Sequence, residues 1–295
     1  MIDAGTGLLN RAWNSLRFRV LHGCPALRSW VEYKAGYGNY LAQLQFSGDA
    51  RLENSAVLKT GDASVRSREY FDYYDAFANY AFRTIWNSHF KTEPAGRTCR
   101  IFDLGSTKTF IGMLSVICAV DSLNLNDPLD RLTSANYICS DVSDYDPRQN
   151  EFRGQYDFVT SLVSFHLLGL GRYGDRLNAG AQTKFIEICD ELLRIGGRLV
   201  FSFSVGKDQL RFNDGWVFSL ETMKGYFPNY DWLDVTIDTN GFGNIDPRRD
   251  AGQRFVKIDP AGDFSEYRYR DFVNDPIPYD VAFVTLQKRT GNDCS

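Results

Sequence analysis

The chain has 295 residues, with 33 lysines and arginines against 37 aspartates and glutamates, and a formal net charge of −4. This mild acidity argues against a general nucleic-acid binder, and an apolar content of 43% excludes disorder as the general state. The length predicts one large domain, or one domain with an extension. Aromatic residues make up 15%, a surplus that fits a packed core and an aromatic-lined pocket equally well.

The six cysteines are widely spaced and form no CxxC pair, and no histidine is close enough to complete a zinc knuckle. We therefore expect no metal, and small buried thiols in a reducing compartment. The best apolar run, 110–120, is shorter than the ~20 residues that a bilayer requires, and no secretory signal is visible. These features predict a cytoplasmic protein.

Residues 1–95 are predicted to form a helical extension. Apolar residues between Leu8 and Leu21 recur at near-helical spacing, with arginines between them. The pattern is typical of a helix packed on its own domain, or of a basic amphipathic helix at the inner face of a membrane. A second helical stretch, 69–90, has a wide aromatic face that is typical of core, and the break at 94–96 predicts a boundary.

From Arg100 onward, stretches of strand length alternate with helical ones, which is the pattern of a doubly wound α/β fold. The predicted strands are 100–104, 119–125, 136–140, 156–162, 198–205, 232–239 and 280–288. The predicted helices between them are 107–118 and 181–195, and Gly196-Gly197 is expected to end the second helix. Together they predict a mostly parallel sheet of seven strands, the last antiparallel, in a domain at 96–295. The polar stretch 241–279 is predicted to be a long insertion.

Ligands of such sheets bind beyond the carboxyl ends of the strands, so the turns there form the candidate site. In the first turn, Asp103 stands at the strand end, where it could accept a hydrogen bond from an ammonium group. Gly105 lets a ligand approach the backbone, and the residues from Ser106 onward open a helix whose free N–H groups attract anions.

The second and third turns also carry polar side chains. Asp121 or Asn124 in the second turn could bind ribose hydroxyls, and Asp141 and Val142 in the third turn could contact an adenine. Any one of these residues could instead be an ordinary surface-turn residue. Their placement at successive strand ends makes the set a stronger signal than its members.

The fourth turn is the most distinctive, because it contains GLGRYGD at 169–175. Its three glycines predict a tight loop whose backbone can lie against a substrate. His166 comes just past the fourth strand, either as a satisfied core histidine or as a functional group at the mouth of the sheet. Arg172 and Asp175 are the charged groups of the loop.

The loop and its surroundings resemble a family of uncharacterised, methyltransferase-like proteins, found among bacterial polysaccharide-synthesis proteins and in some animals. The family's hallmark is the GLGRYGD loop at 169–175, and 103–106 matches its D-h-G-S turn. The aromatic helix before the first strand, Val205-Gly206 and Phe212-Asn213 are similar as well. The resemblance covers about residues 65–220.

The resemblance implies a Rossmann-like class I methyltransferase fold that binds S-adenosylmethionine across Gly105, the second turn and Asp141. The implied reaction is methyl transfer by in-line displacement from a sulfonium, to a hydroxyl of a sugar in a glycan, polysaccharide or nucleotide sugar. Such an acceptor needs a base, for which His166 is the first choice and Asp175 the second. Arg172 would hold an anionic substrate group or brace the loop.

Two other function classes are open to such a chain. A non-catalytic, methyltransferase-like protein could bind a ligand or partner in a polysaccharide assembly, and the single glycine of the first turn favours it. A nicotinamide-dependent oxidoreductase is disfavoured, because the sequence lacks GxGxxG and a YxxxK pair near the fifth strand. Cofactor binding separates these classes.

Overall fold

The structure is a computed structural model that describes residues 36, 39, 40, 42, 56–57, 73–93, 96–126, 134–212, 214–239, 254–264, 267, 269 and 280–290. The chain divides into two compact units, Met1–Asp49 and Ala50–Ser295, and the described residues lie almost entirely in the second. The expected amphipathic helix at 8–21 lies outside them. None of the described helices is long and apolar enough to span a membrane.

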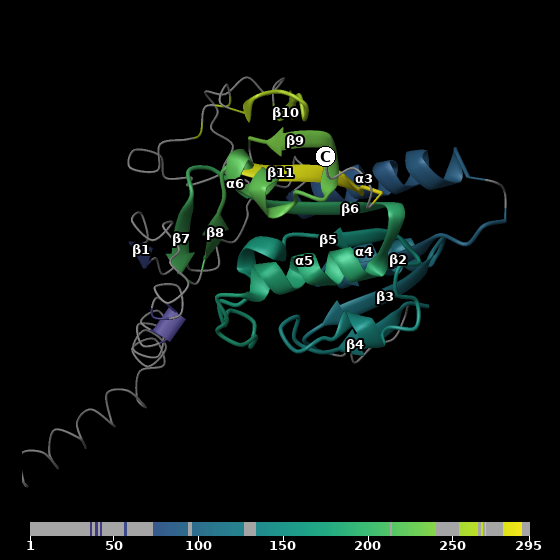
Figure 1. Ribbon diagram of the computed structural model, residues 1–295, viewed down its shortest axis with the longest axis horizontal. Coiled ribbons are helices and arrows are strands. Elements are labelled where there is room, and N and C mark those ends of the chain that lie inside the picture. The colour runs from purple at the N-terminus through teal and green to yellow at the C-terminus, as the bar shows by residue number, and fades with distance from the viewer. Residues whose placement is uncertain are drawn as a thin grey trace, which may run out of the picture. The chain divides into compact units, whose positions relative to one another are not determined.

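The second unit is built on one eight-stranded sheet (Figure 1). In spatial order its strands are β10 (Phe255–Ile258), β9 (Tyr230–Asp238), β11 (Asp280–Lys288), β6 (Leu193–Val205), β5 (Tyr156–Ser161), β2 (Arg100–Leu104), β3 (Ala119–Asn124) and β4 (Asn136–Cys139). From β6 to β4 all neighbours are parallel, whereas β11 is antiparallel to both β6 and β9. The Rossmann-like prediction with an antiparallel last strand is therefore confirmed, and β10 adds an edge strand.

Helices cover both faces of the sheet. They are α3 (Tyr73–Ile85), which continues as a π-helix η2 (Trp86–Phe90), then α4 (Lys108–Ser115), α5 (Ala181–Leu192) and α6 (Leu220–Tyr226). Two short 3-10 helices are η3 (Pro147–Gln149) and η4 (Phe165–Leu167). Apart from the main sheet, β1 (Ala56–Val57), β7 (Gln209–Phe212) and β8 (Gly215–Val217) form a small sheet.

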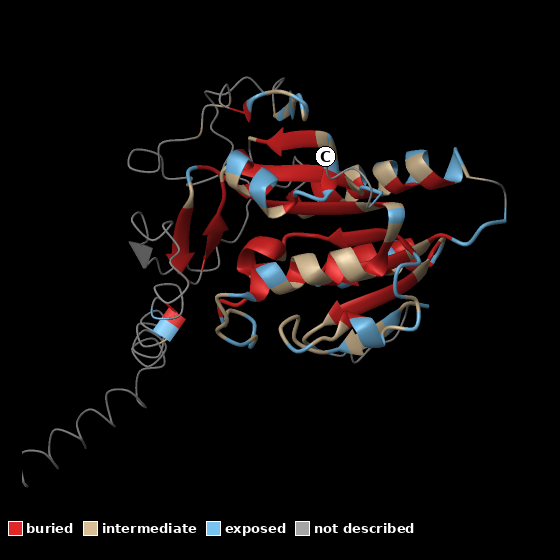
Figure 2. Ribbon diagram, viewed as in Figure 1, coloured by how far each residue is buried: buried red, intermediate tan, exposed pale blue. Residues whose placement is uncertain are grey.

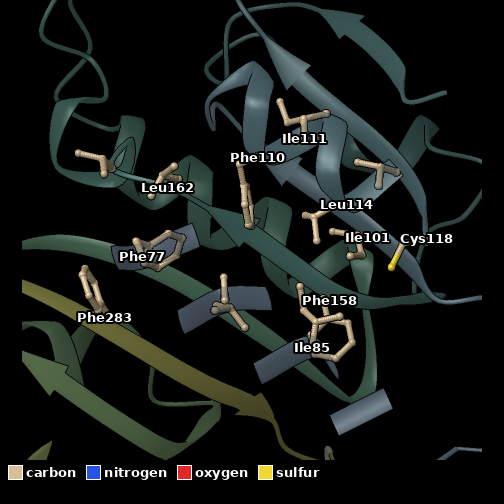
Figure 3. Close-up of a cluster of buried hydrophobic side chains, with 14 of the residues drawn as sticks. Phe77, Ile85, Ile101, Phe110, Ile111, Leu114, Cys118, Phe158, Leu162 and Phe283 are labelled. Atoms are coloured by element: carbon tan, nitrogen blue, oxygen red, sulfur yellow. The ribbon is translucent and has the colours of Figure 1, made fainter. Parts of the chain in front are cut away.

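The strands of the main sheet are mostly buried, and they carry apolar side chains on both faces of the sheet (Figure 2). On one face, Phe77 of α3 and Phe110 of α4 pack in a single cluster with Phe283 of β11 (Figure 3). On the other face, Phe201 of β6 packs against Phe185 of α5, with ring centroids 6.2 Å apart. This double coverage is what the strand–helix alternation in the sequence predicts.

The predicted boundary at residue 95 falls inside the second compact unit. Helix α3, which the sequence assigned to the extension, contributes its aromatic face to the core of the main sheet. The stretch 241–279 is described only in part, and 255–258 within it forms the edge strand β10.

The expected role of the Gly196-Gly197 pair is wrong. We predicted that these glycines end a helix, but α5 ends at Leu192 and both glycines lie within β6. A Cβ atom on Gly197 would lie 2.8 Å from the carbonyl oxygen of Arg194 and 3.0 Å from that of Tyr156. The glycines therefore permit an irregular, close approach of β6 to β5.

Candidate functional site

The order of the parallel strands reverses between β2 and β5, because the chain proceeds outward to β3 and β4 before it returns to β5 and β6. Ligands of such sheets bind beyond the carboxyl ends of the strands at this reversal. A cavity of about 350 Å³ lies there, and it is walled by the turns after β2, β3, β4 and β5. The predicted site residues that line it are Gly105, Ser106, Asn124, Asp141, Val142 and Asp175.

The first turn requires glycine. Gly105 has a φ of +73°, a left-handed conformation that side chains disfavour. A Cβ atom there would lie 2.7 Å from the Ser164 hydroxyl oxygen, which donates a hydrogen bond to the Gly105 carbonyl (2.8 Å). The turn leads into α4, where Thr107 caps the helix and Lys108 also lines the cavity. Backbone amides at the start of α4 are therefore close to the cavity.

Asp103 is fully enclosed and does not line the cavity. Its carboxylate accepts hydrogen bonds from the Ser106 amide (3.0 Å), the Ser106 hydroxyl (2.5 Å) and the Thr160 hydroxyl (2.6 Å). The Ser106 hydroxyl oxygen in turn accepts from the Leu162 amide (2.8 Å). Burial raises the pKa of Asp103 to about 6, although these hydrogen bonds lower it. Asp103 thus fastens the ends of β2 and β5 together, a role different from the direct ligand contact that we expected.

The two candidates of the second turn, Asp121 and Asn124, lie in different places. Asn124 lines the cavity at the end of β3. The Asp121 carboxylate lies in a second cavity of about 500 Å³. There it accepts hydrogen bonds from the side-chain amide of Asn136 (2.8 Å) and from the Tyr156 hydroxyl (2.7 Å). Of the two residues, only Asn124 is placed to meet a ligand in the cavity at the switch point.

The third turn joins the cavity wall to the glycine-rich loop. One carboxylate oxygen of Asp141 accepts from the Ser143 amide (2.7 Å), and the other accepts from the Arg176 amide (2.9 Å). Asp141 and Val142 are both half-buried and line the cavity. Each carboxylate oxygen retains a second lone pair, so Asp141 can still accept a hydrogen bond from a ligand.

The charged residues of the loop have partners within the protein. Asp175 lines the cavity and accepts hydrogen bonds from the amides of Gly171 and Tyr173, both at 3.2 Å. Arg172 donates to the carbonyl oxygen of Asp214 (2.8 Å), which lies next to β8. Both residues therefore brace the loop, a role that the sequence left open for Arg172.

His166 is only 2% exposed, and it is not among the residues that line the cavity. Its ring packs so closely on Gly215 that a Cβ atom there would lie 2.9 Å from it. Burial, and to a lesser extent the charge of Arg172, lower the pKa of His166 to about 3. The imidazole is therefore neutral at working pH and a much weaker base than an exposed histidine.

Several residues that line the cavity were not predicted as site residues from the sequence. Val163, at the end of β5, lines the cavity with a φ of +58°, which is exceptional for a β-branched residue. Such strain concentrates at functional sites. Tyr74, Tyr137 and Lys108 also line it. No sequence pattern marks a valine for a left-handed turn, but the aromatic stripe around Tyr74 was visible and was interpreted as core.

One possible metal cluster among the described residues lies away from this cavity. His89, Cys99 and Asp157 are buried, with ligand atoms within 4.8 Å of one another. The Asp157 carboxylate, however, already accepts hydrogen bonds from Arg97 (2.6 Å) and Arg194 (2.7 Å). Two guanidinium groups oppose the approach of a cation, so these residues fit an ion-pair cluster better than a metal site.

Known proteins are similar to this chain in two ways: a family model matches part of its sequence, and solved structures match its fold. Residues 115–245, less than half of the chain, match a family model described as "Caenorhabditis protein of unknown function, DUF268". No curated protein sequence matches the chain. Among solved structures, the [4+2]-cyclase SpnF is 11% identical over 88% of this chain and 97% of its own, with a TM-score of 0.48.

Two further similar structures are methyltransferases with S-adenosylhomocysteine. The N-methyltransferase NodS from Bradyrhizobium japonicum WM9 is 12% identical over 78% of this chain and 94% of its own, with a TM-score of 0.44. The 1,6-didemethyltoxoflavin-N1-methyltransferase from Burkholderia thailandensis is 12% identical over 80% of this chain and 100% of its own, also with a TM-score of 0.44. At such identities the similarity concerns the fold and assigns no residue a role.

Proposed function

We propose that the cavity binds S-adenosylmethionine and that the chain is a methyltransferase. The observation that carries the proposal is the cavity at the strand-order reversal, whose wall holds Gly105, Asn124 and Asp141 at three successive strand ends. The backbone at Gly105 lines the cavity, and a Cβ atom there would displace the Ser164 side chain, which lines it as well. This arrangement fits a ligand with a charged end, a ribose and a base, lying across β2, β3 and β4.

Each of these residues has chemistry suited to one part of that ligand. The amide oxygen of Asn124 can accept a hydrogen bond from a ribose hydroxyl. Asp141 can accept one from an adenine amino group, and Val142 can pack against the ring. When bound, the cofactor supplies an activated methyl group on a sulfonium. The protein contributes alignment of the acceptor, which is worth up to ~7–11 kcal/mol in the best intramolecular models.

For the acceptor we propose a sugar hydroxyl, which rests on the resemblance of the GLGRYGD loop. The ring of Tyr74 lines the cavity and offers an aromatic face of the kind that packs on sugars. Of the three predicted catalytic residues, Asp175 lines the cavity, whereas His166 is enclosed. As the sulfur–carbon bond of the cofactor breaks and the oxygen–carbon bond forms, the proton of the acceptor hydroxyl would pass to solvent water. Methyl transfer here would therefore depend mainly on the placement of the acceptor relative to the cofactor.

A second candidate function is ligand binding without catalysis. The specific observation in its favour is that His166 is buried while Arg172 and Asp175 are engaged within the protein. A protein with this site could report cofactor occupancy to a partner in polysaccharide assembly without transferring a methyl group.

The test is titration calorimetry with S-adenosylmethionine and S-adenosylhomocysteine, followed by transfer of a labelled methyl group to a panel of nucleotide sugars and glycans. We expect binding of both cofactor forms, and transfer to a sugar. Binding without transfer to any sugar would favour the second candidate. Absence of binding of either cofactor form by the folded protein would overturn the proposal.

A further inference from the structure

The glycine-rich loop is fastened to the turn after β4 by three hydrogen bonds. The Arg176 amide donates to Asp141 (2.9 Å), the Arg176 guanidinium to Asp144 (3.0 Å), and the Asn178 side-chain amide to the Ser143 hydroxyl (2.9 Å). The turn after β4 is the one that holds Asp141 in the cavity wall. The end of the loop at Asp175 and residues 176–178 after it therefore lie beside the third turn.

The base of the loop is closed by the chain itself. The Asn178 amide donates to the Gly169 carbonyl oxygen (3.0 Å), and a Cβ atom on Gly169 would lie 2.1 Å from the Asn178 carbonyl oxygen. Within the loop, both carboxylate oxygens of Asp175 hold backbone amides. These contacts hold the loop beside the third turn, so its exposed side chains are presented at the cavity.

The side chain presented at the cavity is Tyr173. Tyr173 is 57% exposed, and it lines the same cavity as Asp141 and Val142. The Arg172 guanidinium carbon lies 5.3 Å from the ring centroid. A large aromatic ring left exposed at the rim of a cavity offers a face for a flat ligand group.

We propose that residues 173–176 close the nucleoside end of the cavity, with the Tyr173 ring covering the adenine of the cofactor. This inference rests on the proposed function, because it takes the third turn as the adenine end. It differs from the sequence-based expectation that the loop lies against the substrate, with Asp175 as a possible base for the acceptor. The part of the loop directed toward β8, where Arg172 bonds to Asp214, is the part that remains for the acceptor.

The experiment measures dissociation constants for S-adenosylhomocysteine and for adenosine in the full chain. Replacing the ring in Tyr173→Ala should raise both constants by the same factor, about tenfold, because base–aromatic stacking is lost. Tyr173→Phe should recover most of that loss, since it restores the ring. The matched control is Phe255→Ala, which removes a 49% exposed aromatic side chain on β10, outside the cavity.

The outcomes separate the two levels of the proposal. An unchanged constant for S-adenosylhomocysteine in Tyr173→Ala would overturn the inference while the proposed function stands. Adenosine binding that depends on Tyr173, without any binding of S-adenosylhomocysteine, would overturn the proposed function and retain the nucleoside site. Absence of binding of both compounds to the wild type would overturn both. Because Tyr173 is exposed, its replacement should leave the fold intact, and an unchanged melting temperature checks this.

Discussion

Two regions border the same cavity, and each is organised around an aspartate. At the β2–β5 junction, Asp103 is fully enclosed and accepts hydrogen bonds at 2.5–3.0 Å from the amide and hydroxyl of Ser106, just after β2, and from the Thr160 hydroxyl of β5. In the glycine-rich loop, Asp175 is half-buried and accepts two hydrogen bonds at 3.2 Å from its own loop. The first carboxylate joins elements 57 residues apart, and the second holds only its neighbours.

One cavity therefore combines a rigid wall at the β2–β5 junction with an adaptable wall in the glycine-rich loop. Hydrogen bonds in a buried network strengthen one another and are costly to leave unmade, so the junction is rigid. Exposed bonds compete with water and open more easily, which gives the loop freedom to adjust to a ligand. Substitutions at the two regions should therefore differ in the size of their effects.

The largest effect is expected at the junction. Gly105→Ala combines a left-handed φ of +73° with a 2.7 Å approach to Ser164, and should lower the free energy of unfolding by on the order of 3 kcal/mol and abolish cofactor binding. The control Gly154→Ala has a φ of +68° and no atom within 4 Å, so it should cost only about 1 kcal/mol and leave binding intact. Urea denaturation and calorimetry measure both quantities, and equal effects of the two variants would contradict the account of the turn.

The next effect is a pH dependence from Asp103. Its folded pKa of about 6 lies above the ordinary value of 3.8, so the folded state holds this proton more tightly than the unfolded state. The contribution is fully present below pH ~4 and is lost as the pH rises through about 6, on the order of 3 kcal/mol in total. Unfolding free energies of the wild type and Asp103→Asn across pH 4–7 check this. A difference between the two proteins that does not change with pH would exclude it.

A smaller effect is expected on the affinity for S-adenosylhomocysteine, and it should differ between Asp141 of the third turn and Asp121 near the second. Asp141→Asn leaves a single oxygen to serve the amides of Ser143 and Arg176 as well as the ligand, so the dissociation constant of S-adenosylhomocysteine should rise about tenfold, or about 1.4 kcal/mol. Asp121→Asn, in the other cavity, should leave this constant unchanged. Equal losses in the two variants would mean that the cavity at the switch point is not the cofactor site.

The smallest effect is expected on the exposed side of the loop. The Arg176 and Asp144 side chains are 72% and 45% exposed, and pairs of this kind contribute little because water and salt screen them. Arg176→Ala should therefore change the free energy of unfolding by less than ~0.5 kcal/mol, since the backbone bond to Asp141 remains. A loss above 1 kcal/mol in a denaturation series would show that the guanidinium does more than this pair implies.

The sequence predicted the elements of the fold better than the contacts of the site. Alternating strands and helices are encoded by local periodicity, which is why β2, β3, β4 and β5 lie where they were expected. Whether a polar residue near a strand end faces a ligand or the interior depends on where the strand stops and on its neighbours. This is why Asp103 and Asp121 could not be distinguished from Asn124 and Asp141 in advance.

Two other features were beyond a reading of local pattern. The glycine pair at 196–197 resembles a helix stop, and only the neighbouring strand reveals that it allows a close approach. The left-handed turn at Val163 contradicts the backbone preference of valine, and its amide is held by the Ser202 hydroxyl (2.9 Å) from the adjacent strand. In both cases tertiary contacts override the local preference, so the signal lies outside the segment.

The place of β11 in the sheet has a consequence for the order of assembly during synthesis. This strand follows all other strands of the sheet in the chain, yet it lies between β6 and β9 and pairs with both. As the chain leaves the ribosome, the parallel half through β6 can form early, whereas β9 and β10 have no place in the sheet until 280–288 emerges. Until then β6 presents an unpaired apolar edge, the kind of strand edge through which chains pair with one another and aggregate.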